Sequence, residues 1–209
     1  LRTLFPYTTL FRSTDTIPLP VHGEPLRLPF QLRALSLFNY PVPANLLAAL
    51  FRSSADTIHT LNLSSYGGAG GTVDPTLLDA FPIVAAQLRE LRLPPKTNLD
   101  FLPHLSHCTA LTHLTLLSTD PDDLPNTLLA LPSSGTLAFL STRLPEGTTL
   151  ERLAFLVRLV DIDGFPALSK LERLEVFTGS ARMYDGGVGR PDDVFAVCAQ
   201  RGLTLVLNR

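Results

Sequence analysis

The chain has 209 residues, of which 45% are hydrophobic, and a net charge of −2, which suits one domain with a substantial core. This charge gives no electrostatic reason to expect binding to nucleic acid or to an anionic membrane, and no stretch approaches the roughly 18 apolar residues that span a bilayer. Two cysteines are too few for a disulfide framework, so we expect an intracellular, reducing environment.

The N-terminal segment has an unusual composition. Residues 3–13 resemble the in-frame translation of a common sequencing-adapter oligonucleotide, so we interpret residues 1–13 as a non-native segment outside the fold. On this interpretation the native N-terminal part of the protein is missing. Residues 14–31 contain four prolines among apolar residues, which predicts extended chain rather than a helix.

Short strands and helices are then predicted to alternate to the end of the chain. The expected strands cover residues 34–38, 59–63, 90–93, 113–117, 138–142, 173–177 and 203–207. The expected helices cover residues 44–52, 75–81, 99–107, 120–131, 149–160 and 191–201; Pro82 is expected to interrupt the second and Gly202 to stop the last. Acidic pairs such as Asp122-Asp123 and Asp192-Asp193 are interpreted as capping groups at helix starts.

One pattern recurs at each predicted strand. The clear copies are Leu32-x-x-Leu35-x-Leu37, Ile58-x-x-Leu61-x-Leu63, Leu88-x-x-Leu91-x-Leu93, Leu111-x-x-Leu114-x-Leu116 and Leu171-x-x-Leu174-x-Val176. Leu137-x-x-Leu140-x-Thr142 is a degenerate copy, and Leu203-x-Leu205-x-Leu207 forms a closing strand. Because side chains alternate across a strand, the last two apolar positions of each copy should point to the same face. The middle leucines are 23 to 34 residues apart.

This pattern resembles the leucine-rich repeat, in its ribonuclease-inhibitor-like and F-box-associated variety, whose period is roughly 20–29 residues. The resemblance implies an α/β solenoid of about 6–7 irregular repeats over residues 32–209, with short parallel strands on the concave face and helices or loops on the convex face. Residues 190–209 would form the C-terminal cap. A small residue three places before the first leucine (Ala55, Ala85, Cys108 or Ser134) would let the chain pack closely there. The asparagine or cysteine ladder of many such proteins is absent, so we expect an uneven arc.

Three possible sites have simpler explanations. The glycine-rich stretch 67–71 lacks the Lys-Ser/Thr of a phosphate-binding loop, and Asp161-Ile-Asp163-Gly164 lacks most ligands of a calcium loop. The cluster of His104, His107, Cys108 and His113 has the composition of a zinc site. However, Cys108 should point inward and His113 outward, so these ligands should diverge. We therefore expect no cofactor, no metal and no enzymatic activity.

The open strand face is the candidate site. Side chains next to the inward leucines should form this face, and those best suited to anchor a partner are Phe38, Asn62, Arg92, His113, Phe139, Arg143, Arg173, Glu175 and Phe177. Ser141 is expected to be exposed among them. We further expect Arg92, His113, Arg143 and Arg173 to form one transverse stripe that favours an acidic or aromatic-bearing peptide.

The resemblance implies a protein-interaction module that binds a protein on its concave face. The first hypothesis is the substrate-recognition arc of an F-box-type ubiquitin-ligase subunit, which would contact other ligase subunits through the missing N-terminal part. The second is another ribonuclease-inhibitor-like scaffold or GTPase regulator without a ubiquitin link. An enzyme built on the histidine cluster is the third hypothesis, and it is kept only for contrast.

Overall fold

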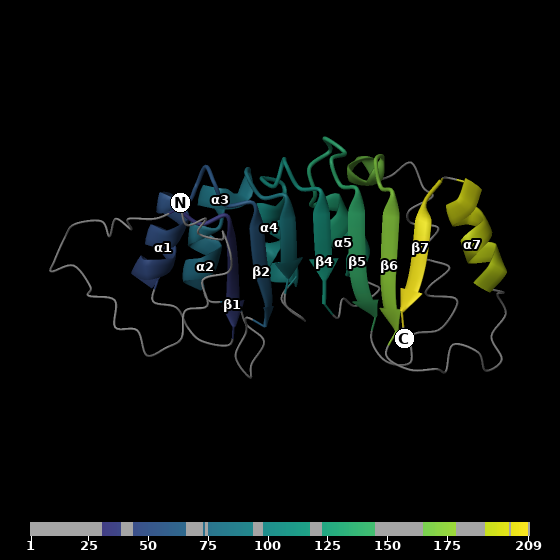
Figure 1. Cartoon of the computed structure of the whole chain (residues 1–209), viewed down its shortest axis with the longest axis horizontal. Helices are drawn as coiled ribbons and strands as arrows, with labels where there is room; N and C mark the ends of the chain where they lie inside the picture. Colours follow the sequence, from purple (N-terminus) through teal and green to yellow (C-terminus); the bar gives the residue numbers. More distant parts are fainter. Residues whose placement is uncertain are drawn as a thin grey trace, which may run out of the picture.

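The computed structural model describes residues 31–38, 44–65, 73, 75–93, 98–117, 123–144, 165–178, 191–200 and 202–208. Within these ranges the chain forms one open parallel sheet, in which the strands follow one another in sequence order (Figure 1). Its strands are β1 (Ala34–Phe38), β2 (Thr60–Ser65), β3 (Glu90–Leu93), β4 (His113–Leu116), β5 (Phe139–Leu144), β6 (Arg173–Thr178) and β7 (Thr204–Asn208). All seven expected strands are therefore present, with ends that differ from the predicted ones by at most two residues.

Helices connect successive strands, as parallel pairing requires. They are α1 (Ala44–Ser53), α2 (Pro75–Ala80), α3 (Pro82–Ala85), α4 (Asn98–Leu105), α5 (Leu124–Leu129), the 3-10 helix η1 (Pro166–Leu168) and α7 (Pro191–Gln200). Pro82 begins a separate short helix, and Gly202 follows α7 with a φ of 67°, so both predicted interruptions are confirmed. The predicted helix 149–160, the glycine-rich stretch 67–71, residues 161–164 and residues 1–30 lie outside the described ranges.

The core consists of aligned leucine rows beneath the sheet. One row joins the middle leucines of all the strands, because these residues are Cα partners from one strand to the next: Leu35, Leu61, Leu91, Leu114, Leu140, Leu174 and Leu205. All of them are buried except Leu205, which is partly buried on the last strand. Their alignment fixes the register, because a slip of one residue would move these leucines to the solvent face.

A backbone hydrogen-bond pattern repeats with the leucines. The carbonyl oxygen two residues before the middle leucine accepts two N–H groups from the next unit of the chain. For example, the Arg89 oxygen accepts the N–H groups of Thr112 and His113 at 2.9 and 2.8 Å. The same double acceptance occurs at Arg33, His59, Thr112 and Ala138. Since the pattern recurs at the same position each time, the units share one backbone geometry at the start of each strand.

The small residues before two of the units differ from the predicted ones. Ala85 and Cys108 are buried as predicted, but Ser134 is exposed, and the buried small residue beside it is Gly135. Gly135 has a φ of 60°, and this left-handed turn shifts the chain by one residue. In the second unit the fully buried residue is Ser54 rather than Ala55, because the Ser54 Oγ accepts a hydrogen bond from the Leu32 N–H at 2.9 Å.

The acidic helix start at Asp123 also differs from the prediction. Asp123 is the N-cap of α5, but its side chain makes no capping hydrogen bond. Its backbone carbonyl instead accepts hydrogen bonds from the N–H and the hydroxyl of Thr127, at 3.1 and 3.2 Å. The two hydrogen bonds from Thr127 therefore stabilise the first turn of α5. None of the described helices is long and apolar enough to cross a bilayer.

Candidate functional site

The open face, defined here as the sheet face opposite the leucine rows, carries three levels of side chains. The first level runs through Ala34, Thr60, Glu90, His113, Phe139, Arg173 and Thr204, and the second through Ser36, Asn62, Arg92, Thr115, Ser141, Glu175 and Val206. Arg143 and Phe177 are Cα partners at the third level. Most of these side chains are exposed or partly buried, so this face meets solvent.

The predicted transverse stripe is wrong. His113 and Arg173 lie on the first level, Arg92 lies on the second, and Arg143 lies on the third. Two residues along a strand separate each level from the next, a distance of roughly 6–7 Å. The prediction failed because the strands are in register at their leucines, and the basic residues occupy different positions relative to those leucines.

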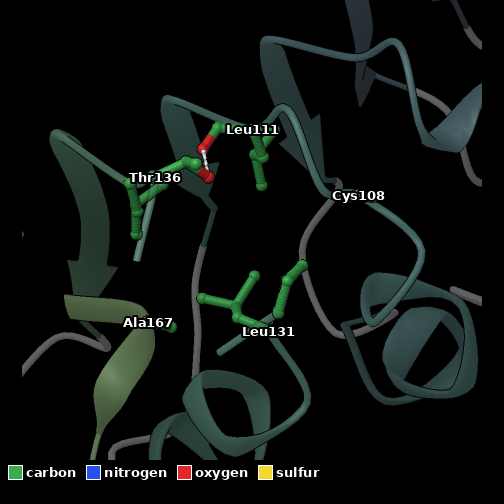
Figure 2. A pocket seen from close by; sticks show the side chains of 7 residues that line it. Cys108, Leu111, Leu131, Thr136 and Ala167 are labelled. Carbon is green, nitrogen blue, oxygen red and sulfur yellow. Dashed lines mark hydrogen bonds between the residues drawn. The ribbon is translucent and has the colours of Figure 1, made fainter. Parts of the chain in front are cut away.

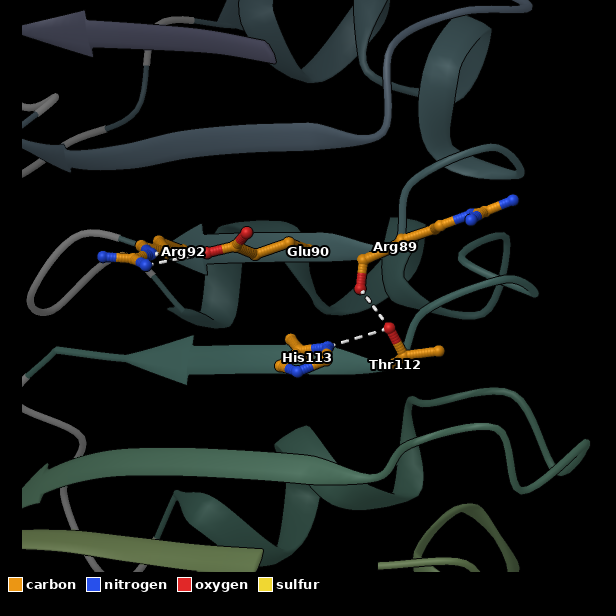
Figure 3. Close-up of polar contacts among 5 residues, drawn as sticks. All are labelled: Arg89, Glu90, Arg92, Thr112 and His113. Carbon is orange, nitrogen blue, oxygen red and sulfur yellow. Dashed lines mark hydrogen bonds and ion pairs between the residues drawn. The ribbon is translucent and has the colours of Figure 1, made fainter. Parts of the chain in front are cut away.

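Two of the arginines are paired with glutamates of their own strand. The Nε and Nη2 atoms of Arg92 donate to Oε1 of Glu90 at 2.9 and 2.8 Å (Figure 3). Arg173 forms the corresponding ion pair with Glu175. Residues two apart on a strand lie on the same face, so each acid partly neutralises its neighbour. The open face is therefore less cationic than its arginines suggest.

At the first level, the Phe139 ring lies between His113 and Arg173. The His113 and Phe139 ring centroids are 5.4 Å apart, and the Arg173 guanidinium carbon lies 5.8 Å from the Phe139 centroid. These distances are in the range of aromatic and cation–π contacts. The three side chains come from β4, β5 and β6, so they couple three strands on the open face.

The Thr112 hydroxyl lies between His113 and the main chain of Arg89. The Thr112 hydroxyl donates to the Arg89 carbonyl oxygen at 3.0 Å and also contacts His113 Nδ1 at 2.9 Å (Figure 3). When the hydroxyl donates its single hydrogen to the Arg89 oxygen, Nδ1 is the donor in the second contact, and Nε2 of that tautomer is an acceptor.

The environment of Ser141 contradicts the expectation that it is exposed. Ser141 lies on the open face, yet only 4% of its surface is accessible. Phe139 and Arg143 flank it along β5, and its Cα partners across the sheet are Thr115 and Glu175. These larger neighbours surround a small side chain, which explains its burial. Within the described part of the chain, the Ser141 hydroxyl has no hydrogen-bond partner.

Arg143 is the exposed cation beside it. Its Cα partner on β6 is Phe177, a residue with 37% of its surface accessible. Among the described residues, Arg143 forms no ion pair, in contrast to Arg92 and Arg173. We call Ser141, Arg143 and Phe177 the Ser141–Arg143 site.

Two other predicted face residues lie away from this site. Asn62 is partly buried on β2, as the Cα partner of Arg92. Phe38 ends β1 opposite Ser65, and the placement of its side chain is outside the described atoms. These two residues therefore lie on β1 and β2, in the first half of the sheet.

The histidine and cysteine cluster is divided between the two sides of the sheet. Cys108 is fully buried in the core, and burial raises the pKa of its thiol from 9.0 to about 12. The His104 ring packs against Phe81, with centroids 6.2 Å apart, whereas His113 lies on the open face. No group of three metal-ligating side chains occurs among the residues that the structure describes.

A small cavity lies next to Cys108 (Figure 2). Its volume is about 10 Å³, close to the least that a single water molecule needs. Its lining comprises Cys108, Leu111, Leu131, Pro132, Thr136, Leu137 and Ala167. Because it is so small and mostly apolar, it is a packing gap rather than a binding site.

Two spacings in the sequence indicate the ion pairs. Glu90-Leu-Arg92 and Arg173-Leu-Glu175 each place opposite charges two residues apart on a predicted strand, and such residues share a face. No equivalent pattern marks Ser141, whose burial depends on neighbours from three strands.

No protein-family model matches the chain, and no curated protein shows significant sequence similarity to it.

Proposed function

We propose that the chain is a leucine-rich-repeat solenoid whose open face binds a protein partner, and that it is not an enzyme. The repeated leucine positions and the recurring double hydrogen bonds at the strand starts support a repeat architecture. Such architectures bind partners on extended sheet surfaces formed by several repeats. The Cys108-x-x-Leu111 spacing and the final helix and strand favour the ribonuclease-inhibitor-like variety.

The side chains of the open face are the observation that supports protein binding. The open face presents aromatic and charged groups to solvent, with the contiguous row of His113, Phe139 and Arg173 at its centre. Aromatic residues and arginine are the types that most often dominate the energy of protein interfaces. The opposite face of the sheet is covered by buried leucines and is part of the core, so a partner cannot reach it.

A matched pair of variants tests this face. Thr115→Arg adds a long cationic side chain to the second level of the open face, whereas Asn126→Arg makes the same change in charge at an exposed position of α5. Proteins captured by the wild-type chain should be lost with Thr115→Arg and retained with Asn126→Arg, while both variants keep the wild-type melting temperature. If capture is equal for the two variants, the open face is not the binding surface.

For the biological role, we favour the substrate-recognition arc of an F-box-type ubiquitin-ligase subunit, because the repeat pattern resembles that family. The alternative is a scaffold or GTPase regulator without a ubiquitin link. Proteins that co-purify with the native protein from its source distinguish them: ubiquitin-ligase subunits among these proteins support the first role, and their absence supports the second.

A further inference from the structure

We propose that the Ser141–Arg143 site is where the open face recognises its partner, and that it binds an extended peptide segment in which an acidic side chain lies next to an aromatic or aliphatic one. This inference rests on the proposed protein-binding function and names the chemistry of the partner. It follows from three neighbouring features of β5 and β6.

The first feature is the difference between the arginines. Arg92 and Arg173 already have carboxylate partners on the same face, Glu90 and Glu175. A ligand carboxylate that approached either of them would have to compete with an existing ion pair. Arg143 is exposed and has no acidic partner in the described part of the chain, so charge complementarity directs an incoming carboxylate to Arg143.

The second feature is the Ser141 hydroxyl. Only 4% of the surface of Ser141 is accessible, and its hydroxyl has no hydrogen-bond partner among the described residues. Two residues along a strand share a face, so Ser141 and Arg143 lie side by side. A main-chain carbonyl or N–H group of a bound segment would satisfy the hydroxyl, and burying it without such a partner would be unfavourable.

The third feature is the apolar surface next to the cation. Phe177 is the Cα partner of Arg143 and is one of the exposed large hydrophobic residues of the described chain. Phe139 lies two residues before Ser141 on the same strand and is partly exposed. An aromatic or aliphatic side chain next to the acidic one would cover Phe177, which adds apolar contact to the charged contact.

Random decapeptides displayed on phage provide the probe, because they assume no particular sequence. The library is selected in parallel on the wild-type chain, on Arg143→Gln and on Arg92→Gln. Arg92→Gln is the matched control, since it removes a cation of the same face that already has an acidic partner. We expect peptides with an acidic residue within two positions of an aromatic or aliphatic residue to be enriched on wild type and on Arg92→Gln. Arg143→Gln should weaken binding of the enriched peptides at least tenfold, and Ser141→Ala at least threefold.

Several results would contradict the inference. Enriched peptides without acidic residues, equal losses from Arg143→Gln and Arg92→Gln, or no enrichment on the wild-type chain would each overturn it. Peptides that are insensitive to Arg143→Gln but lost with Thr115→Arg would overturn this inference and leave open-face binding in place. If no peptide is enriched, the capture experiment with Thr115→Arg and Asn126→Arg still decides open-face binding by itself. Melting curves of the variants exclude unfolding as the cause.

Discussion

The hydroxyl of Thr136 donates a 2.8 Å hydrogen bond to the carbonyl oxygen of Leu111, a residue 25 positions earlier in the chain. Thr57 makes the equivalent contact with the Leu32 carbonyl oxygen at 2.9 Å, again across 25 positions. Each threonine immediately precedes the first apolar position of its unit, and each acceptor is the first apolar position of the previous unit. This side-chain contact therefore joins successive units, in addition to the backbone pairing of their strands.

Removal of this contact should destabilise the fold. Thr136→Val keeps the shape of the side chain but loses the donor, so we expect a loss of about 1 kcal/mol in the free energy of unfolding. Urea denaturation measures the change. Thr204→Val, at an exposed position of β7, serves as the control and should change stability by less than about 0.5 kcal/mol. Equal effects of the two substitutions would show that the Thr136 contact contributes nothing.

The leucine row should carry much of the stability. Leu114 is fully buried at the centre of the row, so Leu114→Ala should cost about 2–5 kcal/mol. Its neighbour Thr115 points to the open face, and Thr115→Ala should cost less than about 0.5 kcal/mol. Denaturant titrations of both variants test this difference, and similar losses would contradict the assignment of the two faces.

Gly135 should tolerate substitution less well than Gly202. Both have positive φ, at 60° and 67°, and an L-residue there costs roughly 1–2 kcal/mol. A Cβ at Gly135 would also lie 2.2 Å from Ser169 Oγ and 3.0 Å from the Pro166 oxygen, whereas nothing lies within 4 Å at Gly202. Gly135→Ala should therefore lower the melting temperature more than Gly202→Ala does. Adding Ser169→Ala should recover part of the difference; without any recovery, the Ser169 contact is not the cause.

Thr142 offers a stabilising substitution. Its hydroxyl is buried in the leucine-side core and has no hydrogen-bond partner among the residues that the structure describes, and its Cα partners are the apolar residues Leu116 and Val176. Valine has nearly the same shape without the unsatisfied group, so Thr142→Val should stabilise the fold by about 1 kcal/mol. Thermal and urea denaturation check the sign, and a loss of stability would mean that the hydroxyl has a favourable contact.

Cys108 should make stability depend on pH in alkaline solution. Burial raises the pKa of its thiol from 9.0 to about 12, so between these values the unfolded chain loses a proton that the folded chain keeps. The thiol therefore contributes its full stability below about pH 9, and that contribution declines as the pH rises toward 12. The difference in unfolding free energy between wild type and Cys108→Ala should shrink from pH 8 to pH 10.5. A constant difference would show that the thiol titrates normally in the folded chain.

The sequence by itself determined the order and register of the strands in the described chain. A leucine pattern that recurs every 23 to 34 residues specifies which side chains enter the core, and the strands align at those side chains because any other register would expose them. The same reasoning correctly placed Cys108 in the core and His113 on the opposite face. Proline and glycine marked the break before α3 and the end of α7, since both act on the local backbone.

Only the tertiary structure decided which groups of the open face meet. The three levels of the basic residues and the Glu90–Arg92 and Arg173–Glu175 pairs follow from spacings within a repeat once the leucines align. The structure was needed to show that Arg143 lies exposed beside Phe177. Ser141 is buried by side chains from neighbouring strands, and Gly135 rather than Ser134 fills the small position because of a left-handed turn. The surroundings of Ser141 and Arg143 arise from contacts between different strands, and a pattern within one repeat does not specify them.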